Sequence, residues 1–395
     1  MHWRLILGIC LGCAALFGSI GAAWLLSLPQ GQAVPAVPPI ARTEADAIIA
    51  TLKPPKRPRP LIAIIGINDA TETTDYLMPY GILRRADVAD VVALATHPGP
   101  VLLLPALKVE PQATVADFDA RHPEGADYVI VPAMSRDDDP AALTWIKSQA
   151  SKGASIIGVC AGAKVVAAAG LLAGKRATTH WYYLDELRQN HPAIHYVADR
   201  RLVVDQGVAT TTGISASMPM ALTLIEAIAG RDKAQAVGRD LGLMSWDARH
   251  PSDAFRFTRP FALTAIGNTL AFWMHEQLGI SLVASVDEVS LALVADAWSR
   301  TYRSRALTFA STEAAQVSRH GIGILPDRVT ASWPAKQLLA PIESPKPAKV
   351  LDDALDAIAA RYGARTADFV AMQLEYPRFR PPPIASSGNS RPLTR

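Results

Sequence analysis

The feature that most constrains this chain is a series of short apolar runs alternating with helical periods, which begins at Pro60. Runs of this length that are rich in β-branched residues are typical of strands buried on both faces of a sheet. Between them, residues 72–84 and 140–151 have helical periodicity. The alternation predicts an α/β fold with a parallel sheet and helices on both faces. The runs are PLIAIIGI, VVALAT, VLLLP, DYVIVPA and SIIGVC.

This first unit is predicted to be flavodoxin-like and to span residues 60–246. After SIIGVC it is expected to continue with a hairpin of IHYVAD and RLVVDQ, then GVATTTG and a helix over about 215–230. A connector over 247–276 follows, with a helix near 263–278. A shorter α/β unit is predicted over 277–377, from the runs ISLVASVDEV, LTFAS and GIGILPD and a helix near 351–374. Residues 378–395 are predicted to be a disordered tail.

The two units contain similar helices, ALTLIEAIAG ending at Gly230 and ALDAIAARYG ending at Gly363. The similarity indicates that the second unit is a shortened, degenerate repeat of the first, although two amphipathic helices can also match by chance. The second unit contains no cysteine. We expect either an internal pseudo-dimer of the two units or a homodimer.

The N-terminus contains an uncharged apolar stretch from Leu5 to Leu28. As a helix it would be roughly 36 Å long, enough to span a bilayer. Residues 1–29 are therefore predicted to be a membrane anchor, or alternatively a cleaved signal, with Cys10 and Cys13 as small apolar residues. The body is expected on the periplasmic side of the inner membrane, or exported after cleavage. Residues 30–59 are proline-rich and predicted to be a linker.

Composition narrows the classes of function. The formal net charge of +3 comes from 39 basic and 36 acidic residues, and no long run of like charge is present. Such a chain has no strong field for nucleic acid, so we expect no nucleic-acid partner. The histidines have no spacing typical of a metal site, and we expect neither a metal nor another cofactor.

Cys160 is the candidate reactive group. It stands between the buried run SIIGV and an alanine-rich helix, with Gly158, Ala161 and Gly162 around it. Small residues leave room for the sharp turn that exposes a nucleophile above a sheet. The N-terminus of the following helix favours thiolate over thiol, so we expect a lowered pKa at Cys160.

His180 follows twenty residues later, after the helix and the run KRATT. The chain can return it beside the turn, where a histidine can hydrogen-bond the thiolate or move a proton. Trp181, Tyr182 and Tyr183 come directly after it and are candidates for the pocket wall.

The sequence GVCAGAKVVAAAGLLAGKRATTHW resembles the nucleophile turn of the ThiJ/PfpI superfamily, within the class I glutamine amidotransferase-like fold. It is most similar to the sensor domains of AraC-type regulators and to isonitrile hydratases. The likeness covers residues 60–246. It implies a small-molecule substrate or ligand and an acid after the first strand, four residues before a proline. Asp75 has that position relative to Pro79, with Glu72 one turn earlier.

The resemblance implies that Asp75 handles a proton, and the N–H of Ala161 is the expected oxyanion donor. Three features of this sequence depart from the pattern of the family. Ala161 stands where isonitrile hydratases usually have threonine and PfpI-type peptidases histidine. Pro132, Ala133 and Met134 replace the family's Pro-Gly-Gly loop, and the helix-turn-helix part of the regulators is absent from 247–395. We expect a hydrolase, hydratase or glyoxalase-like enzyme, or alternatively a ligand or redox sensor.

Overall fold

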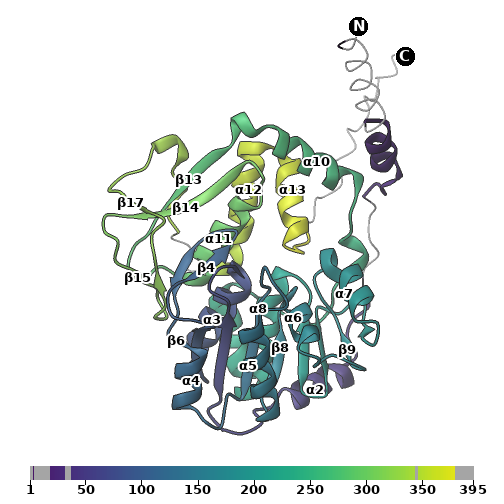
Figure 1. Ribbon diagram of the computed structural model, residues 1–395, viewed down its shortest axis with the longest axis vertical. Coiled ribbons are helices and arrows are strands. Elements are labelled where there is room, and N and C mark those ends of the chain that lie inside the picture. Colours follow the sequence, from purple (N-terminus) through teal and green to yellow (C-terminus); the bar gives the residue numbers. More distant parts are fainter. Residues whose placement is uncertain (1–2, 4–17, 32–36, 343–345, 379–395) are drawn as a thin grey trace, which may run out of the picture.

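The computed structural model describes residues 3, 18–31, 37–342 and 346–378. Figure 1 shows the first unit in the lower half and the second unit, in green to yellow, above it. The predicted spanning segment falls mostly outside the described residues, which include only its last part, helical over 18–27. Among the helices that the structure describes, none combines the length and apolar character needed to cross a bilayer.

A seven-stranded sheet forms the centre of the first unit. Its strands follow the predicted apolar runs because each run is buried, as in β1, where every residue is buried. The order is β11-β12-β8-β7-β1-β3-β6. The bounds are β1 Leu61–Gly66, β3 Asp90–Ala95, β6 Ala113–Thr114, β7 Tyr128–Val131, β8 Ser155–Gly158, β11 Leu202–Asp205 and β12 Val208–Thr211.

The sheet is mixed, which corrects the prediction of a parallel one. All neighbours run parallel except β11, which pairs antiparallel with β12. The hairpin was predicted one segment too early, since RLVVDQ contains β11, which pairs with the strand after it, β12, and not with IHYVAD. In the structure β10 (His195–Tyr196) pairs parallel with β9 (Arg176–Ala177) instead.

Helices cover both faces of the sheet, as predicted. Ile62 and Ile64 of β1 face α3 and α8, whereas Ala63 and Ile65 face α5 and α6. Alternate residues of one strand thus support two separate cores. The helices of this unit are α3 Thr73–Ala86, α4 Val115–Arg121, α5 Pro140–Ser151, α6 Gly162–Ala168, α7 Leu184–Asn190, α8 Ser217–Ala229 and α9 Arg231–Leu241.

The predicted linker is partly structured. It contains α2 (Arg42–Thr51), and the chain after it is held by Asp127, whose carboxylate accepts from the backbone N–H groups of Lys56, Arg57 and Leu61. The segment therefore packs on the first unit over these residues.

The second unit repeats the order of elements of the first. Parallel strands β13 (Glu276–Ser281) and β14 (Ser304–Ala310) flank α11 (Glu288–Ser299), as β1 and β3 flank α3. The helix predicted over 263–278 ends early, because α10 (Arg259–Leu270) stops before β13 begins. The remaining strand of this sheet is β17, Arg328–Val329.

The helix predicted over 351–374 is two helices. α12 (Pro347–Tyr362) and α13 (Ala364–Gln373) meet at Gly363, which has φ 91° and ψ 154°. The same break separates α8 from α9 at Gly230, with φ 86° and ψ 168°. A positive φ favours glycine at both positions. The two similar sequence segments therefore end in the same backbone conformation.

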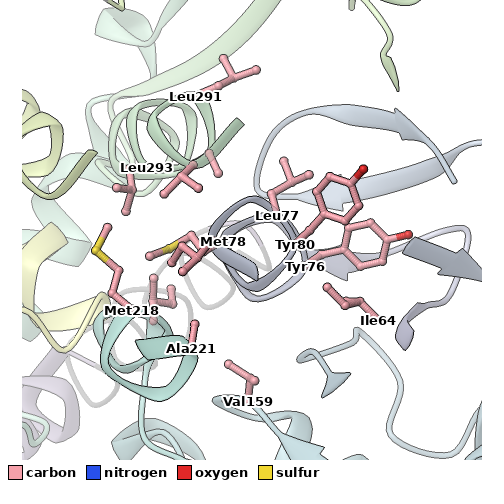
Figure 2. Close-up of a cluster of buried hydrophobic side chains, with 14 of the residues drawn as sticks. Ile64, Tyr76, Leu77, Met78, Tyr80, Val159, Met218, Ala221, Leu291 and Leu293 are labelled. Atoms are coloured by element: carbon pink, nitrogen blue, oxygen red, sulfur yellow. The ribbon is translucent and has the colours of Figure 1, made fainter. Parts of the chain in front are cut away.

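The two units share a core and a sheet. Side chains from α3, α8 and α11 meet in one cluster, which includes Met78, Met218 and Leu293 (Figure 2). The run VLLLP was predicted to be a buried strand of the main sheet, but β4 belongs to a five-stranded sheet that joins the units. Its strands are β2 Thr71–Glu72, β4 Val101–Leu104, β5 Lys108–Glu110, β15 Gln316–Val317 and β16 Gly323–Ile324.

Candidate active site

The turn at Cys160 is sharp and strained, as predicted, but it buries the side chain instead of exposing it. Cys160 lies between β8 and α6 with φ 57°, a left-handed conformation that costs free energy for a residue other than glycine. Its backbone N–H donates to the Thr211 hydroxyl at 3.1 Å, and its carbonyl accepts from the Thr179 hydroxyl at 3.0 Å. These bonds hold the strained residue from two neighbouring segments.

Gly162 makes the turn possible. A Cβ at this position would lie 2.0 Å from the carbonyl oxygen of Val131, the last residue of β7. Helix α6 can therefore begin directly above the sheet only because residue 162 has no side chain.

The sulfur lies in a different electrostatic setting from the one predicted. Cys160 is only 4% exposed. Burial raises its pKa well above the usual value, the negative charges of Asp75, Glu72 and Glu375 add to the effect, and a hydrogen bond from the Ala161 N–H opposes it. The expectation of a lowered pKa is wrong for this structure, because burial and nearby carboxylates outweigh the N-terminus of α6.

Asp75 lies in the first turn of α3 and is fully buried. Its Oδ2 accepts from the Ala133 N–H at 3.1 Å, whereas Oδ1 is buried with no hydrogen-bond partner among the described residues. Burial, followed by the charge of Glu72, raises the Asp75 pKa well above its usual range. A carboxyl group in this state can hold a proton at neutral pH.

Ala133 belongs to the loop that replaces Pro-Gly-Gly. The Ala133 N–H donates to the Asp75 carboxylate, and the Ala133 carbonyl accepts from the Glu72 N–H at 2.8 Å. The loop therefore positions the acid of the site through both of its backbone groups.

His180 lines the same cavity, but both of its ring nitrogens have backbone partners. Nε2 lies 2.9 Å from the Gln373 carbonyl, and Nδ1 accepts from the Tyr182 N–H at 3.2 Å. This pattern sets the tautomer with the proton on Nε2. Burial lowers the pKa of His180, which keeps the ring neutral.

Arg300 is a site residue that sequence reasoning missed. It follows α11 in the second unit, and its Nη2 donates to Glu72 Oε1 at 2.8 Å while Nε donates to Asp296 Oδ1 at 2.7 Å. Burial raises the pKa of Asp296 to about 7 although Arg300 opposes the shift. No sequence motif marks Arg300, which lies 228 positions from its partner Glu72.

Glu375 is the second residue that was missed. Its buried carboxylate accepts from the backbone N–H of Trp181 at 2.6 Å and of Gly213 at 2.7 Å. It therefore ties the end of the second unit to the segment that carries His180. His250 lies 3.3 Å from the same carboxylate.

A cavity of about 530 Å³ opens above Cys160 between the two units. The predicted wall residues Trp181, Tyr182 and Tyr183 do line it, and most of its other walls are apolar or aromatic. Within the described ranges, no group of three or more His, Cys, Asp and Glu side chains is arranged to hold a metal ion. The chain after the first unit contributes Phe257, Phe261, Ala265, Arg300, Tyr302, Phe369 and Gln373 to the lining.

Comparisons with known proteins agree with the resemblance read from the turn. The model of the DJ-1/PfpI family matches residues 62–227. The isonitrile hydratase of Pseudomonas putida is 35% identical over 168 residues, which are 41% of this chain and 70% of that enzyme. The HTH-type transcriptional regulator CdhR of Pseudomonas aeruginosa is 32% identical over 171 residues, 42% of this chain and 47% of the regulator.

Solved structures similar to this chain include Drosophila melanogaster DJ-1beta, with 23% identity and a TM-score of 0.42. The similarity covers 47% of this chain and 98% of that protein. The residues matched by the family model lie within the first unit.

Proposed function

Because this chain belongs to the DJ-1/PfpI family, we propose that it is an enzyme in which Cys160 attacks a small electrophile, a carbonyl compound or an isonitrile. One observation carries the proposal. The strained Cys160 lies at a cavity of about 530 Å³. Its sulfur accepts a hydrogen bond from the Ala161 N–H, and burial together with the charge of the buried Asp75 raises its pKa. A thiol, a proton carrier and a backbone donor are the parts that such an addition needs.

The raised pKa values set the order of proton movement. The raised pKa favours the protonated form of Asp75, so the reaction proceeds from the minor ionised form. Ionised Asp75 takes the proton from the Cys160 thiol as the S–C bond forms, so that no free thiolate has to accumulate. With a carbonyl compound, the electron pair of the C=O bond moves to the oxygen, near the Ala161 N–H, and Asp75 gives the proton to that oxygen. With an isonitrile, the negative charge forms on the attacked carbon, and Asp75 gives the proton to that carbon. In both cases the addition leaves the net charge unchanged.

The cavity favours an uncharged, partly apolar substrate. Most of its wall is apolar or aromatic, and the cation within it, Arg300, is already paired with Glu72 and Asp296. An anionic substrate would have to compete with two carboxylates for that guanidinium. The relative that acts on isonitriles is 35% identical, but this chain has Ala161 where a threonine is usual in such enzymes. A carbonyl compound is therefore the other class to test.

The experiment is a turnover assay of the full chain with an alkyl isonitrile, methylglyoxal and a small amide. We expect product from at least one of them, with loss in Cys160→Ser and a large decrease in Asp75→Asn. Asp87→Asn, at the exposed far end of α3, is the matched control and should keep full activity. Equal turnover by Cys160→Ser would contradict the proposal.

The second candidate function is a ligand sensor without turnover. The observation that favours it is the raised pKa of Cys160, which disfavours the thiolate that a nucleophile or a redox sensor needs. Regulators are also among the relatives. A compound that raises the melting temperature of wild type and Cys160→Ser equally, without being consumed, would select this function.

The C-terminal unit is proposed to act as an internal partner that completes the site. Arg300, Gln373 and Glu375 come from it, and β13-α11-β14 repeats the order β1-α3-β3. A chain with such a pseudo-dimer is expected to be monomeric. Sedimentation at the monomer mass of 42.2 kDa would agree, and a stable dimer would contradict it.

The location of the chain is likewise a proposal. The uncharged stretch Leu5–Leu28 supports attachment to the inner membrane with the body in the periplasm, or export after cleavage. A reporter joined after residue 395 that is active only in the cytoplasm would contradict both. Fractionation then separates the anchored from the cleaved form.

A further inference from the structure

Helix α10 and the following turn η4 (Phe272–Met274) have an unusual composition for surface elements. Residues 260–274, PFALTAIGNTLAFWM, contain no charged side chain. A helix on the surface of a water-soluble protein normally has charged residues on its outer face. Only Ala262 and Asn268 of α10 are buried, so most of its apolar residues are not in the core.

The outward side of these elements is a contiguous apolar face. Each of its six large side chains is at least 40% exposed, and four of them occupy the last residue of α10 and the turn directly after it. A patch of this kind in contact with water marks a surface that binds something apolar. We call it the α10 face, defined by Leu263, Ile266, Leu270, Phe272, Trp273 and Met274.

The orientation of α10 is fixed from its inner side. Asn268 Nδ2 donates to the Thr301 carbonyl at 2.8 Å and to the Thr366 hydroxyl at 3.2 Å. Phe261 and Ala265 line the Cys160 cavity. Since these contacts prevent the helix from turning over, the apolar side chains stay outward.

The α10 face continues into the end of the N-terminal apolar segment. The Arg259 guanidinium donates to the carbonyls of Leu25, Leu26 and Leu28. The rings of Trp24 and Phe257 are 5.9 Å apart. Figure 1 shows the helix of residues 18–27 beside α10 at the same end of the molecule.

Aromatic and basic residues at the edge of the face favour a lipid surface over a purely apolar partner. Trp273 and Phe272 are the residue types that insert at the headgroup level. Arg303 has its guanidinium 3.8 Å from the sulfur of Met274, and Arg256 is exposed just before α10. Cations in this position are attracted by anionic headgroups.

We propose that the α10 face docks on the surface of a lipid bilayer, with its apolar side chains among the headgroups and upper acyl chains. The docking is peripheral and does not require a helix that crosses the bilayer. It places Phe261 and Ala265, which form one wall of the Cys160 cavity, next to the lipid surface. The proposal is independent of whether Cys160 turns over a substrate.

The test is hydrogen–deuterium exchange of the full chain with and without vesicles that contain an anionic phospholipid. We expect slower exchange over 260–274 when vesicles are present. In the double variant Leu270→Glu/Trp273→Glu this protection is lost. Val329→Glu, at another exposed apolar residue, on β17, is the matched control and should behave as wild type. Because these side chains are exposed, the variants should fold, which circular dichroism checks.

Fluorescence quenching by brominated lipids is a second test, and it uses a conservative variant. Vesicles of these lipids should quench part of the tryptophan fluorescence of the wild type. The quenched part should be lost in Trp273→Phe and kept in Trp333→Phe. Unchanged exchange over 260–274 in a chain that sediments with vesicles would overturn the proposal, as would a failure to bind vesicles. A dimer that Leu270→Glu/Trp273→Glu dissociates, with no effect of vesicles, would also overturn it and assign the face to a second copy of the chain.

Discussion

The guanidinium of Arg300 donates to the carboxylate of Glu72 across the boundary between the two units, at 2.8 Å. The other end of the same helix pair has the reverse arrangement, in which Arg85 at the end of α3 pairs with Asp287 at the start of α11. Helices α3 and α11 are thus linked at both ends by an arginine and an acidic N-cap. The Arg300 end lies at the cavity that Cys160 lines.

Replacing Arg300 is expected to change both stability and thiol chemistry. Arg300→Gln leaves Glu72 and Asp296 without their cation, and we expect the free energy of unfolding to fall by about 2–4 kcal/mol. Loss of the positive charge should also raise the Cys160 pKa further. Urea unfolding and thiol alkylation against pH measure the two effects. Arg305→Gln, on an exposed arginine, is the control and should change neither.

The pKa of Cys160 is the direct test of its burial. Alkylation of the wild-type thiol is expected to have a midpoint above the ordinary cysteine value of about 8.5. Asp75→Asn should move the midpoint to lower pH, because an ionised Asp75 opposes formation of the thiolate beside it. A wild-type midpoint well below 8.5 would instead support the thiolate expected from the sequence. Asp87→Asn should leave the curve in place.

Two glycine-to-alanine variants should have opposite effects. Gly162→Ala puts a Cβ 2.0 Å from the Val131 carbonyl oxygen. We expect it to lower the free energy of unfolding by about 2–4 kcal/mol and to distort the turn at Cys160. Gly267→Ala, within α10, meets nothing within 4 Å and should stabilise the chain by about 0.5–1 kcal/mol. Denaturant unfolding compares them, and equal effects would contradict the close approach of α6 to β7.

Stability should fall in mild acid through His250. Burial lowers its pKa, although Glu375 opposes the shift. Below the unfolded value of about 6.5 the unfolded chain therefore binds more protons than the folded chain, and stability falls as pH decreases through that value. Unfolding at about pH 7.5 and about pH 5.5 should show a smaller loss in His250→Asn than in wild type. The exposed His195→Asn should lose as much as wild type.

Local sequence was sufficient for the turn and for the strands around it. The turn at Cys160 depends on Gly162 and on a buried strand directly before it, both visible in the sequence. The acid Asp75 was found through the resemblance, and the structure places it buried in the first turn of α3. The partner of RLVVDQ in the hairpin was predicted wrongly. The segment before it, IHYVAD, was chosen, whereas the structure pairs RLVVDQ with the segment after it.

What the sequence could not predict depends on contacts between distant segments. The pKa of Cys160 follows from burial and from acids such as Glu375, which is far along the chain. Arg300 is one of several arginines in this part of the sequence. Its role follows from its position at the C-terminal end of α11, which packs beside α3. The break at Gly363 interrupts a continuous amphipathic pattern, so periodicity alone predicted one helix there.

The position of α3 between α8 and α11 has a consequence for synthesis of the chain. Arg85 and its partner Asp287 are 202 positions apart, so the ribosome completes the whole first unit before α11 exists. During that interval the side of α3 that includes Leu77 and Met78 lacks the neighbours that bury it in Figure 2. A nascent chain with such a surface is prone to aggregate.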